Sequence, residues 1–209
     1  MDLIFVTDLT QSKINQDYLN SFEKILSIDK IDKVRIITNE KTYNIINDYI
    51  KNKKYKLDIS LVALKKDGKY KLVEIVNDAI VSSKTKDDMM IILDHKLISI
   101  DLNKVKRYFD AIKKPIVILY KSSSKRLIKK YGEYYLDEDG FIKSFRGHIS
   151  DVKSGLISAG IFIFPKDSLF WFGKFLKSGS DKLNFGTLIK KISQKRKVRG
   201  IVENEIMKV

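Results

Sequence analysis

Residues 89–94 read Met-Met-Ile-Ile-Leu-Asp, a run of five apolar side chains that ends in a carboxylate. An apolar residue at every position indicates a strand that is buried on both faces, as in the middle of a parallel sheet. Ligands of open parallel sheets bind beyond the carboxyl ends of the strands. Asp94 is therefore the leading candidate for chemistry, as a ligand of a divalent cation that bridges phosphate oxygens. The alternative is that Asp94 only caps a turn.

The segments before and after this strand alternate between β-branched runs and amphipathic stretches. Strands are predicted at 3–6, 34–38, 57–64 and 115–120, and helices at 17–26, 42–50, 72–81 and 102–112. Such alternation is typical of βαβ units. The sequence thus predicts a single three-layer α/β/α domain over residues 1–209, with a mostly parallel, mixed sheet.

Beyond residue 120 the pattern changes. Residues 131–136 and 141–145 flank Asp137-Glu138-Asp139-Gly140, which predicts a small antiparallel hairpin with glycine where the turn needs positive φ. A strand at 159–164, helices at about 168–176 and 183–193, and a strand at 198–202 are predicted to follow.

Composition excludes several classes of protein. The 209 residues contain no cysteine, so disulfides, thiolate zinc sites and a cysteine nucleophile are excluded. No apolar run reaches 18 residues and no signal peptide is evident, so we expect a soluble cytoplasmic protein without a membrane span. The formal charge of +15 favours an anionic partner. However, 35 of the 41 basic residues are lysine and isoleucine outnumbers alanine 30 to 4, which is typical of an AT-rich genome and compatible with a thermophilic source.

Common catalytic motifs are missing. The sequence lacks the glycine-rich dinucleotide fingerprint, the P-loop and the zinc-protease helix motif. His95 and His148 are its only histidines, and no nucleophile elbow accompanies them. Neither histidine is expected to carry chemistry.

One stretch carries a resemblance to a known family. Tyr131-Gly132, residues 136–145 and the run Ser158-Ala159-Gly160-Ile161-Phe162 follow one another in the order of the Y-G, D-x-x-G and N-A-G-I-Y motifs of sugar-phosphate nucleotidyltransferases. Upstream, Ile91-Ile92-Leu93-Asp94 is similar to the segment whose aspartate holds Mg²⁺ in that family. The resemblance covers residues 28–202 and implies a GT-A-like fold, a nucleoside triphosphate or nucleotide-sugar as ligand, and nucleotidyl transfer to a sugar 1-phosphate.

The resemblance also implies where the ligand would bind. The candidate substrate-binding residues follow the first strand, lie in the hairpin region, or stand in the N-A-G-like run: Thr7, Asp8, Lys13, Gly132, Ser158 and Gly160. Lys13, Lys96 or Lys121 would supply positive charge, and Asp94 would hold the metal.

Three family features are absent, and they keep a second function open. The segment after the first strand lacks glycine and arginine, Gly147-His148 stands in place of Glu-Lys, and no late W-x-D-x-G-T carboxylate follows. Glycine allows backbone to approach phosphate closely, so its loss weakens that mode of binding. The alternative function is a catalytically inactive regulatory or assembly module, for which the aromatic run 170–172 with Phe175 is a candidate oligomer surface; a buried core position is the more common role of such a run.

A third function is nucleic-acid binding through lysine-rich surfaces. Basic clusters occur at 51–56, 65–71, 121–130 and 190–199, and the third leads into Tyr131, Tyr134 and Tyr135, which could stack on bases. Lysines on helix faces are more often simply solvated.

Overall fold

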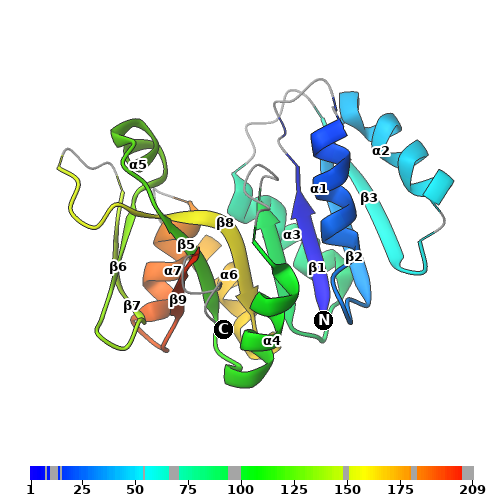
Figure 1. Ribbon diagram of the computed structural model, residues 1–209. Coiled ribbons are helices and arrows are strands. Elements are labelled where there is room, and N and C mark those ends of the chain that lie inside the picture. Colours follow the sequence, from blue (N-terminus) through cyan, green and yellow to red (C-terminus); the bar gives the residue numbers. More distant parts are fainter. Residues whose placement is uncertain are drawn as a thin grey trace.

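The computed structural model describes residues 1–7, 9, 14, 16–53, 55–65, 71–93, 100–147, 151–179 and 183–203. Over these residues the chain forms one nine-stranded mixed sheet with helices on both faces (Figure 1). The main path runs β3-β2-β1-β4-β8-β5-β9, and the β6–β7 hairpin joins it through β8. The predicted α/β fold with a mostly parallel, mixed sheet and a hairpin addition is confirmed.

The amino-terminal half is the predicted series of parallel units. It comprises β1 (Asp2–Val6), α1 (Gln16–Leu26), β2 (Lys33–Asn39), α2 (Glu40–Lys53), β3 (Asp58–Leu64), α3 (Leu72–Ser83), β4 (Met89–Leu93) and α4 (Leu102–Ile112). β1 pairs in parallel with β2 on one side and with β4 on the other. The boundaries of β4 and α4 coincide with the prediction, because strong periodicity or an uninterrupted apolar run marks both ends.

The carboxyl-terminal half closes the sheet. It comprises β5 (Ile116–Lys121), α5 (Lys125–Tyr131), β6 (Glu133–Leu136), β7 (Ile142–Arg146), β8 (Leu156–Phe164), the 3₁₀ turn η1 (Lys166–Ser168), α6 (Phe170–Leu176), α7 (Phe185–Ser193) and β9 (Arg199–Val202). β8 runs antiparallel between β4 and β5, and β9 returns parallel to β5.

Two predictions in this half need correction. Residues 125–131 form α5, whereas the sequence was interpreted there as a charged segment leading directly into a strand at 131. Ser124 caps this short helix by accepting a hydrogen bond from the Leu127 amide, and Ile128 is buried against Ile157. β8 begins at Leu156, three residues before the predicted strand, because pairing with β5 extends it.

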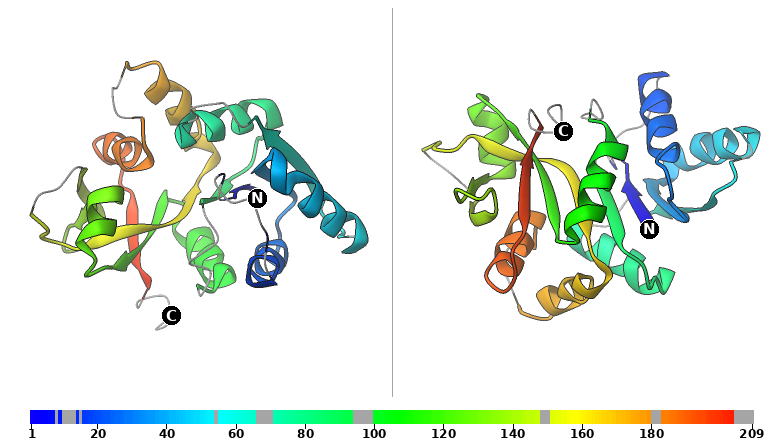
Figure 2. Two further views of the ribbon diagram at one scale, coloured as in Figure 1. Left: turned by 90° about the horizontal axis from the view of Figure 1, so that it is seen from above. Right: turned by 60° about the horizontal axis from the view of Figure 1, so that its bottom comes forward.

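Two apolar cores lie on opposite faces of the sheet. Helices α1, α2 and α4 cover one face, and α3, α6 and α7 cover the other (Figures 1 and 2). Alternate residues of β1 serve the two cores: Leu3 and Phe5 face the first, and Ile4 and Val6 the second. The same double burial is the reason that β4 is apolar at every position.

The aromatic run at 170–172 belongs mostly to the second core. Trp171, Phe172 and Phe175 are buried, whereas Phe170 is 58% exposed and stacks beside Trp171. Three of the four aromatic residues of 170–172 and 175 are therefore core residues, and only Phe170 is left as a candidate surface residue. No helix in the described part of the chain is long and apolar enough to cross a membrane.

Candidate functional site

The carboxyl ends of β1, β2 and β4 meet at one edge of the sheet. Val6, the last residue of β1, pairs with Ile37 of β2 and with Leu93 of β4. Because the three strands are parallel, the residues that follow them gather at this carboxyl edge. Thr7 follows β1 there, and Asn39 ends β2 two residues beyond Ile37.

Thr7 braces β1 against β2. Its hydroxyl donates to the Thr38 hydroxyl over 3.0 Å, and the Thr38 and Thr42 hydroxyls lie 2.6 Å apart. Thr7 is only 4% exposed, and Thr38 and Thr42 are also buried. The side chain that was predicted to bind substrate is thus engaged in a buried network at the edge.

Breaking this network is expected to destabilise the protein. Thr38→Val keeps the side-chain shape but removes the hydroxyl shared by Thr7 and Thr42, which should cost about 1–3 kcal/mol of unfolding free energy. Thr38→Ser, which keeps the hydroxyl, is the matched control and should lose less. Chemical denaturation compares the two variants, and an equal loss in both would show that the hydroxyl contributes nothing.

Asn39 connects the end of β2 to the segment after β1. Its side-chain nitrogen donates to the Leu9 carbonyl over 3.1 Å, and its side-chain oxygen accepts from the Thr42 amide over 3.0 Å. Asn39 therefore caps α2 and holds the Leu9 carbonyl beyond the end of β1. The sequence analysis did not identify Asn39, although an asparagine directly before a helix is a common capping residue.

β8 brings Ser158 and Gly160 to the end of β4. Val117 of β5 pairs with Phe162 of β8, but Leu119 pairs with Ser158, so β8 has extra residues between these two pairs and forms a bulge there. Gly160 lies in this bulge with φ +76°, and a Cβ there would stand 2.2 Å from the carbonyl oxygen of Leu93. Its amide donates to the Ser158 hydroxyl over 3.0 Å. Only glycine permits this approach, which places the N-A-G-like run directly against the residue before Asp94.

Gly132 packs on the hairpin. It has φ +77°, and a Cβ there would overlap the ring of Phe145 and the carbonyl of Arg146. Gly186 of α7 contacts the same ring equally closely. These contacts explain why glycine is needed at position 132 without any ligand. Because Tyr134 pairs with Leu156 in antiparallel register, Gly132 lies on the side of β8 that leads to Ser158.

Glu133 is a buried carboxylate that the sequence analysis missed. It is 0% exposed and accepts hydrogen bonds from the hydroxyls of Tyr135 and Ser154. It also accepts hydrogen bonds from the three consecutive backbone amides of residues 153–155. Burial alone would raise the pKa of Glu133, but these hydrogen bonds outweigh it and lower the pKa to about 2. A glutamate at the first position of β6, a strand otherwise made of tyrosine and leucine, is the only sequence signal that points to this role.

The carboxylate of Glu133 holds the segment that leads into β8. Lys121 at the end of β5 donates to the Ser154 carbonyl, and the Ser122 amide donates to the Gly155 carbonyl over 2.9 Å. Lys121, which was considered as a source of charge for phosphate, is thus bound to this segment. The end of β5 pairs with the start of β8 at the carboxyl edge of the sheet. Residues 153–155, which directly precede β8, therefore form part of the rim of this edge.

A family model described as nucleotidyl transferase matches residues 18–206. The chain belongs to the nucleotidyl transferase family. No protein of curated function matches it by sequence.

Two solved structures show how far the family fold is shared. A UDP-glucose pyrophosphorylase complexed with UDP-glucose matches with a TM-score of 0.71 and 14% identity, over 96% of this chain and 90% of that one. A putative glucose-1-phosphate thymidylyltransferase from Bacillus anthracis, in complex with a sucrose, matches with a TM-score of 0.74 and 12% identity, over 96% and 85%. At these identities the likeness establishes the nucleotidyltransferase fold.

The structure gathers three of the predicted site residues at the carboxyl edge. Thr7, Ser158 and Gly160 lie around the adjoining ends of β1 and β4, and Gly132 lies farther along the β6–β8 pairing. Asp8, Lys13 and Asp94, with Lys96, His95 and His148, lie outside the described residues. Binding of substrate or metal by any of these residues stays a prediction.

Basic residues around one surface hollow are partly paired with carboxylates. A hollow of about 350 Å³ is lined by Ile112–Pro115, Arg196 and Lys197. Lys113 pairs with Asp88 and Asp110, and Arg196 donates to both carboxylate oxygens of Asp167. Ion pairs of this kind reduce the positive potential that a nucleic-acid backbone would meet.

Proposed function

We propose that this member of the nucleotidyl transferase family binds a nucleoside triphosphate or a nucleotide-sugar at the carboxyl edge of β1, β4 and β8. The close approach of Gly160 to the Leu93 carbonyl carries the proposal. It presents backbone rather than side chain beside the end of β4, where phosphate-binding α/β proteins hold their ligands. Ser158 and Gly132 extend this surface along β8 and β6.

Asp94 would hold Mg²⁺ in this proposal. Members of the family typically use Mg²⁺, and an aspartate directly after a central strand offers the oxygen ligands that this ion prefers. Glu133 does not compete for the ion, because its carboxylate is occupied by hydrogen-bond donors. Bound Mg²⁺ would neutralise charge on the phosphate oxygens.

The proposed function includes nucleotidyl transfer to a sugar 1-phosphate. A phosphate oxygen of a sugar 1-phosphate would attack the α-phosphorus of the nucleoside triphosphate, and the bond to the leaving pyrophosphate would break. The residues of this chain would contribute orientation: Asn39 holds the Leu9 carbonyl, Thr7 is held by Thr38, and Glu133 holds residues 153–155.

Binding is tested by thermal unfolding with millimolar Mg²⁺ and each nucleoside triphosphate or UDP-glucose in turn. A ligand at tenfold its dissociation constant should raise the midpoint by about 3–6 °C, since binding to the folded state stabilises it. Asp94→Asn should abolish this shift. Asp58→Asn, an exposed carboxylate at the start of β3, is the charge-matched control and should retain it. No shift with any nucleotide would contradict the proposal.

An inactive assembly module is the second candidate function. The buried engagement of the Thr7 hydroxyl and the exposed ring of Phe170 favour it. This module would bind no nucleotide and would self-associate. Light scattering distinguishes the two functions: a monomer that binds nucleotide supports the transferase, and an oligomer without nucleotide binding supports the module.

A further inference from the structure

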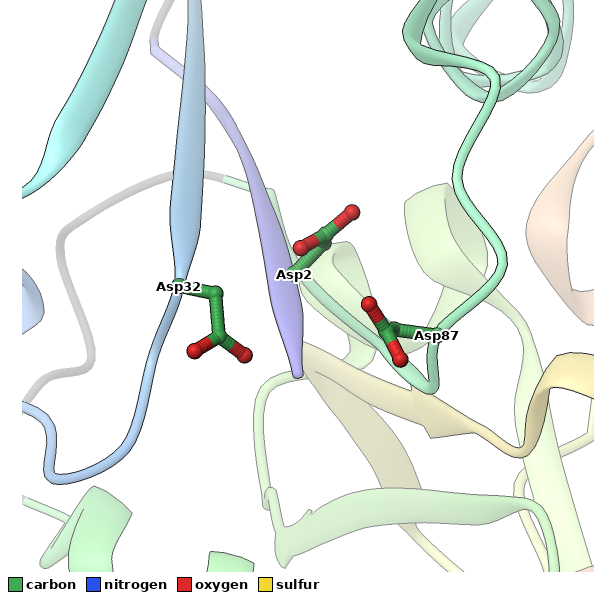
Figure 3. A group of neighbouring side chains, drawn as sticks. All are labelled: Asp2, Asp32 and Asp87. Atoms are coloured by element: carbon green, nitrogen blue, oxygen red, sulfur yellow. The ribbon is translucent and has the colours of Figure 1, made fainter.

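The amino ends of three strands bring three aspartates together at the edge of the sheet opposite the proposed nucleotide site. Asp2 begins β1, Asp32 directly precedes β2, and Asp87 lies two residues before β4 (Figure 3). One carboxylate oxygen from each residue lies within 4.8 Å of the other two. β1 is five residues long, so this cluster lies roughly 13 Å from the carboxyl edge.

Backbone contacts fix the segments that carry the cluster. The Asp32 amide donates to the Met1 carbonyl over 3.0 Å, and the Asp2 amide donates to the Asp88 carbonyl over 2.9 Å. The Thr85 hydroxyl donates to Asp2 and in turn accepts from the Asp87 amide. The three carboxylates therefore approach one another because of pairing between β1 and its neighbours.

Asp2 supplies a second observation. It is only 5% exposed, and its Oδ1 atom is fully buried without a hydrogen-bond partner among the described residues. Figure 3 shows the Asp2 carboxylate on the side of Asp87. A buried carboxylate oxygen without a donor is costly, and a bound cation is one of the few ways to satisfy it.

The charge of the cluster points to a divalent ion. The α-ammonium group of Met1 contacts Asp32 at 2.5 Å and compensates one of the three negative charges. Two charges are left at Asp2 and Asp87. The ligand atoms are all carboxylate oxygens, and Asp32 and Asp87 are exposed, so water can complete the coordination shell.

We propose that Asp2, Asp32 and Asp87 form a structural binding site for a divalent cation, with Ca²⁺ as the preferred ion. Ca²⁺ accepts irregular sets of carboxylate and water oxygens, whereas Mg²⁺ demands near-ideal octahedral geometry. The ion ties the amino end of β1 to the segments that precede β2 and β4. It is separate from a Mg²⁺ ion at Asp94, which would lie at the carboxyl edge.

The test is thermal unfolding of chelator-treated protein in CaCl₂ without nucleotide. At tenfold the dissociation constant, Ca²⁺ should raise the midpoint by about 3–6 °C. Asp87→Asn should lose this shift, and so should Asp2→Asn. Because Asp87 is exposed, its variant is expected to fold even if the Asp2 variant does not. Glu138→Gln, which removes one exposed carboxylate in the turn between β6 and β7, should respond as the original protein does.

Asp94→Asn separates this site from the proposed nucleotide site. If the cation binds at the amino edge, Asp94→Asn keeps the Ca²⁺ shift and loses only the shift that needs nucleotide. A Ca²⁺ shift that disappears in Asp94→Asn but persists in Asp87→Asn would place the ion at the carboxyl edge and overturn the proposal. The absence of any shift with Ca²⁺ in the original protein would also overturn it.

Discussion

Replacing Gly160 by alanine is expected to cost about 3 kcal/mol or more of unfolding free energy. The residue has φ +76°, a conformation that costs an L-residue about 1–2 kcal/mol. The added Cβ would also stand 2.2 Å from the Leu93 carbonyl oxygen, a backbone atom that can move only if β8 and β4 separate. Forced overpacking of this kind adds about 1–3 kcal/mol. Chemical denaturation measures the loss.

Two other glycines serve as controls. Gly179 also has positive φ, +65°, but a Cβ there would meet nothing within 4 Å, so Gly179→Ala isolates the conformational cost. Gly173 lies in α6 without positive φ, and Gly173→Ala should be neutral or slightly stabilising because alanine favours helix. If Gly160→Ala lost no more than Gly179→Ala, the close approach of β8 to β4 would be refuted.

The variant also tests the proposed site. The Leu93 carbonyl lies at the end of β4, so a shift of β4 away from β8 is expected to disturb the proposed nucleotide site. We therefore expect Gly160→Ala to weaken nucleotide binding even at temperatures where the protein remains folded.

Replacing Glu133 by glutamine is expected to cost about 3 kcal/mol at pH 7. The folded-state pKa of about 2 lies below the ordinary value of 4.5, which corresponds to roughly 3 kcal/mol of preferential binding of the ionised form. Glutamine keeps the shape but turns an NH₂ group toward backbone amides that need acceptors. Urea denaturation at pH 7 measures the difference, and the exposed Glu138, changed to glutamine, is the control.

The effect of this carboxylate should depend on pH in a defined direction. The folded protein binds the Glu133 proton less tightly than the unfolded chain, so the stabilisation is complete above about pH 5 and is lost as the pH falls toward 2. The stability difference between the original protein and Glu133→Gln should therefore shrink on acidification. A difference that stays constant between pH 7 and pH 3 would show that the charge of Glu133 is not what holds residues 153–155.

Local sequence patterns predicted the parallel half of the fold well. The apolar run at 89–93 and the amphipathic stretch at 102–112 gave the observed limits of β4 and α4, because burial of the core faces imposes their periodicity. The helix at 125–131 was missed because four of its seven residues are basic and only Ile128 is buried. A single buried side chain leaves no period to detect.

The candidate site was predictable in position but not in its contacts. The rule that ligands bind beyond the carboxyl ends of parallel strands located the edge, and the N-A-G-like run located Ser158 and Gly160. Nothing in the sequence shows that the Thr7 hydroxyl meets Thr38, 31 residues away, or that Glu133 accepts from amides 20–22 residues away. Such contacts depend on strand order, which local patterns do not encode.

The sequence by itself determined the alternation of strands and helices, the fully buried central strands and the family resemblance, because each follows from the chemistry of neighbouring residues. Tertiary structure alone decided that β8 enters antiparallel between β4 and β5, since this depends on which strands compete for the same edge. That insertion requires glycine at position 160 against Leu93. Strand pairing likewise decided that Asp2, Asp32 and Asp87, dispersed along the first 87 residues, meet at the opposite edge.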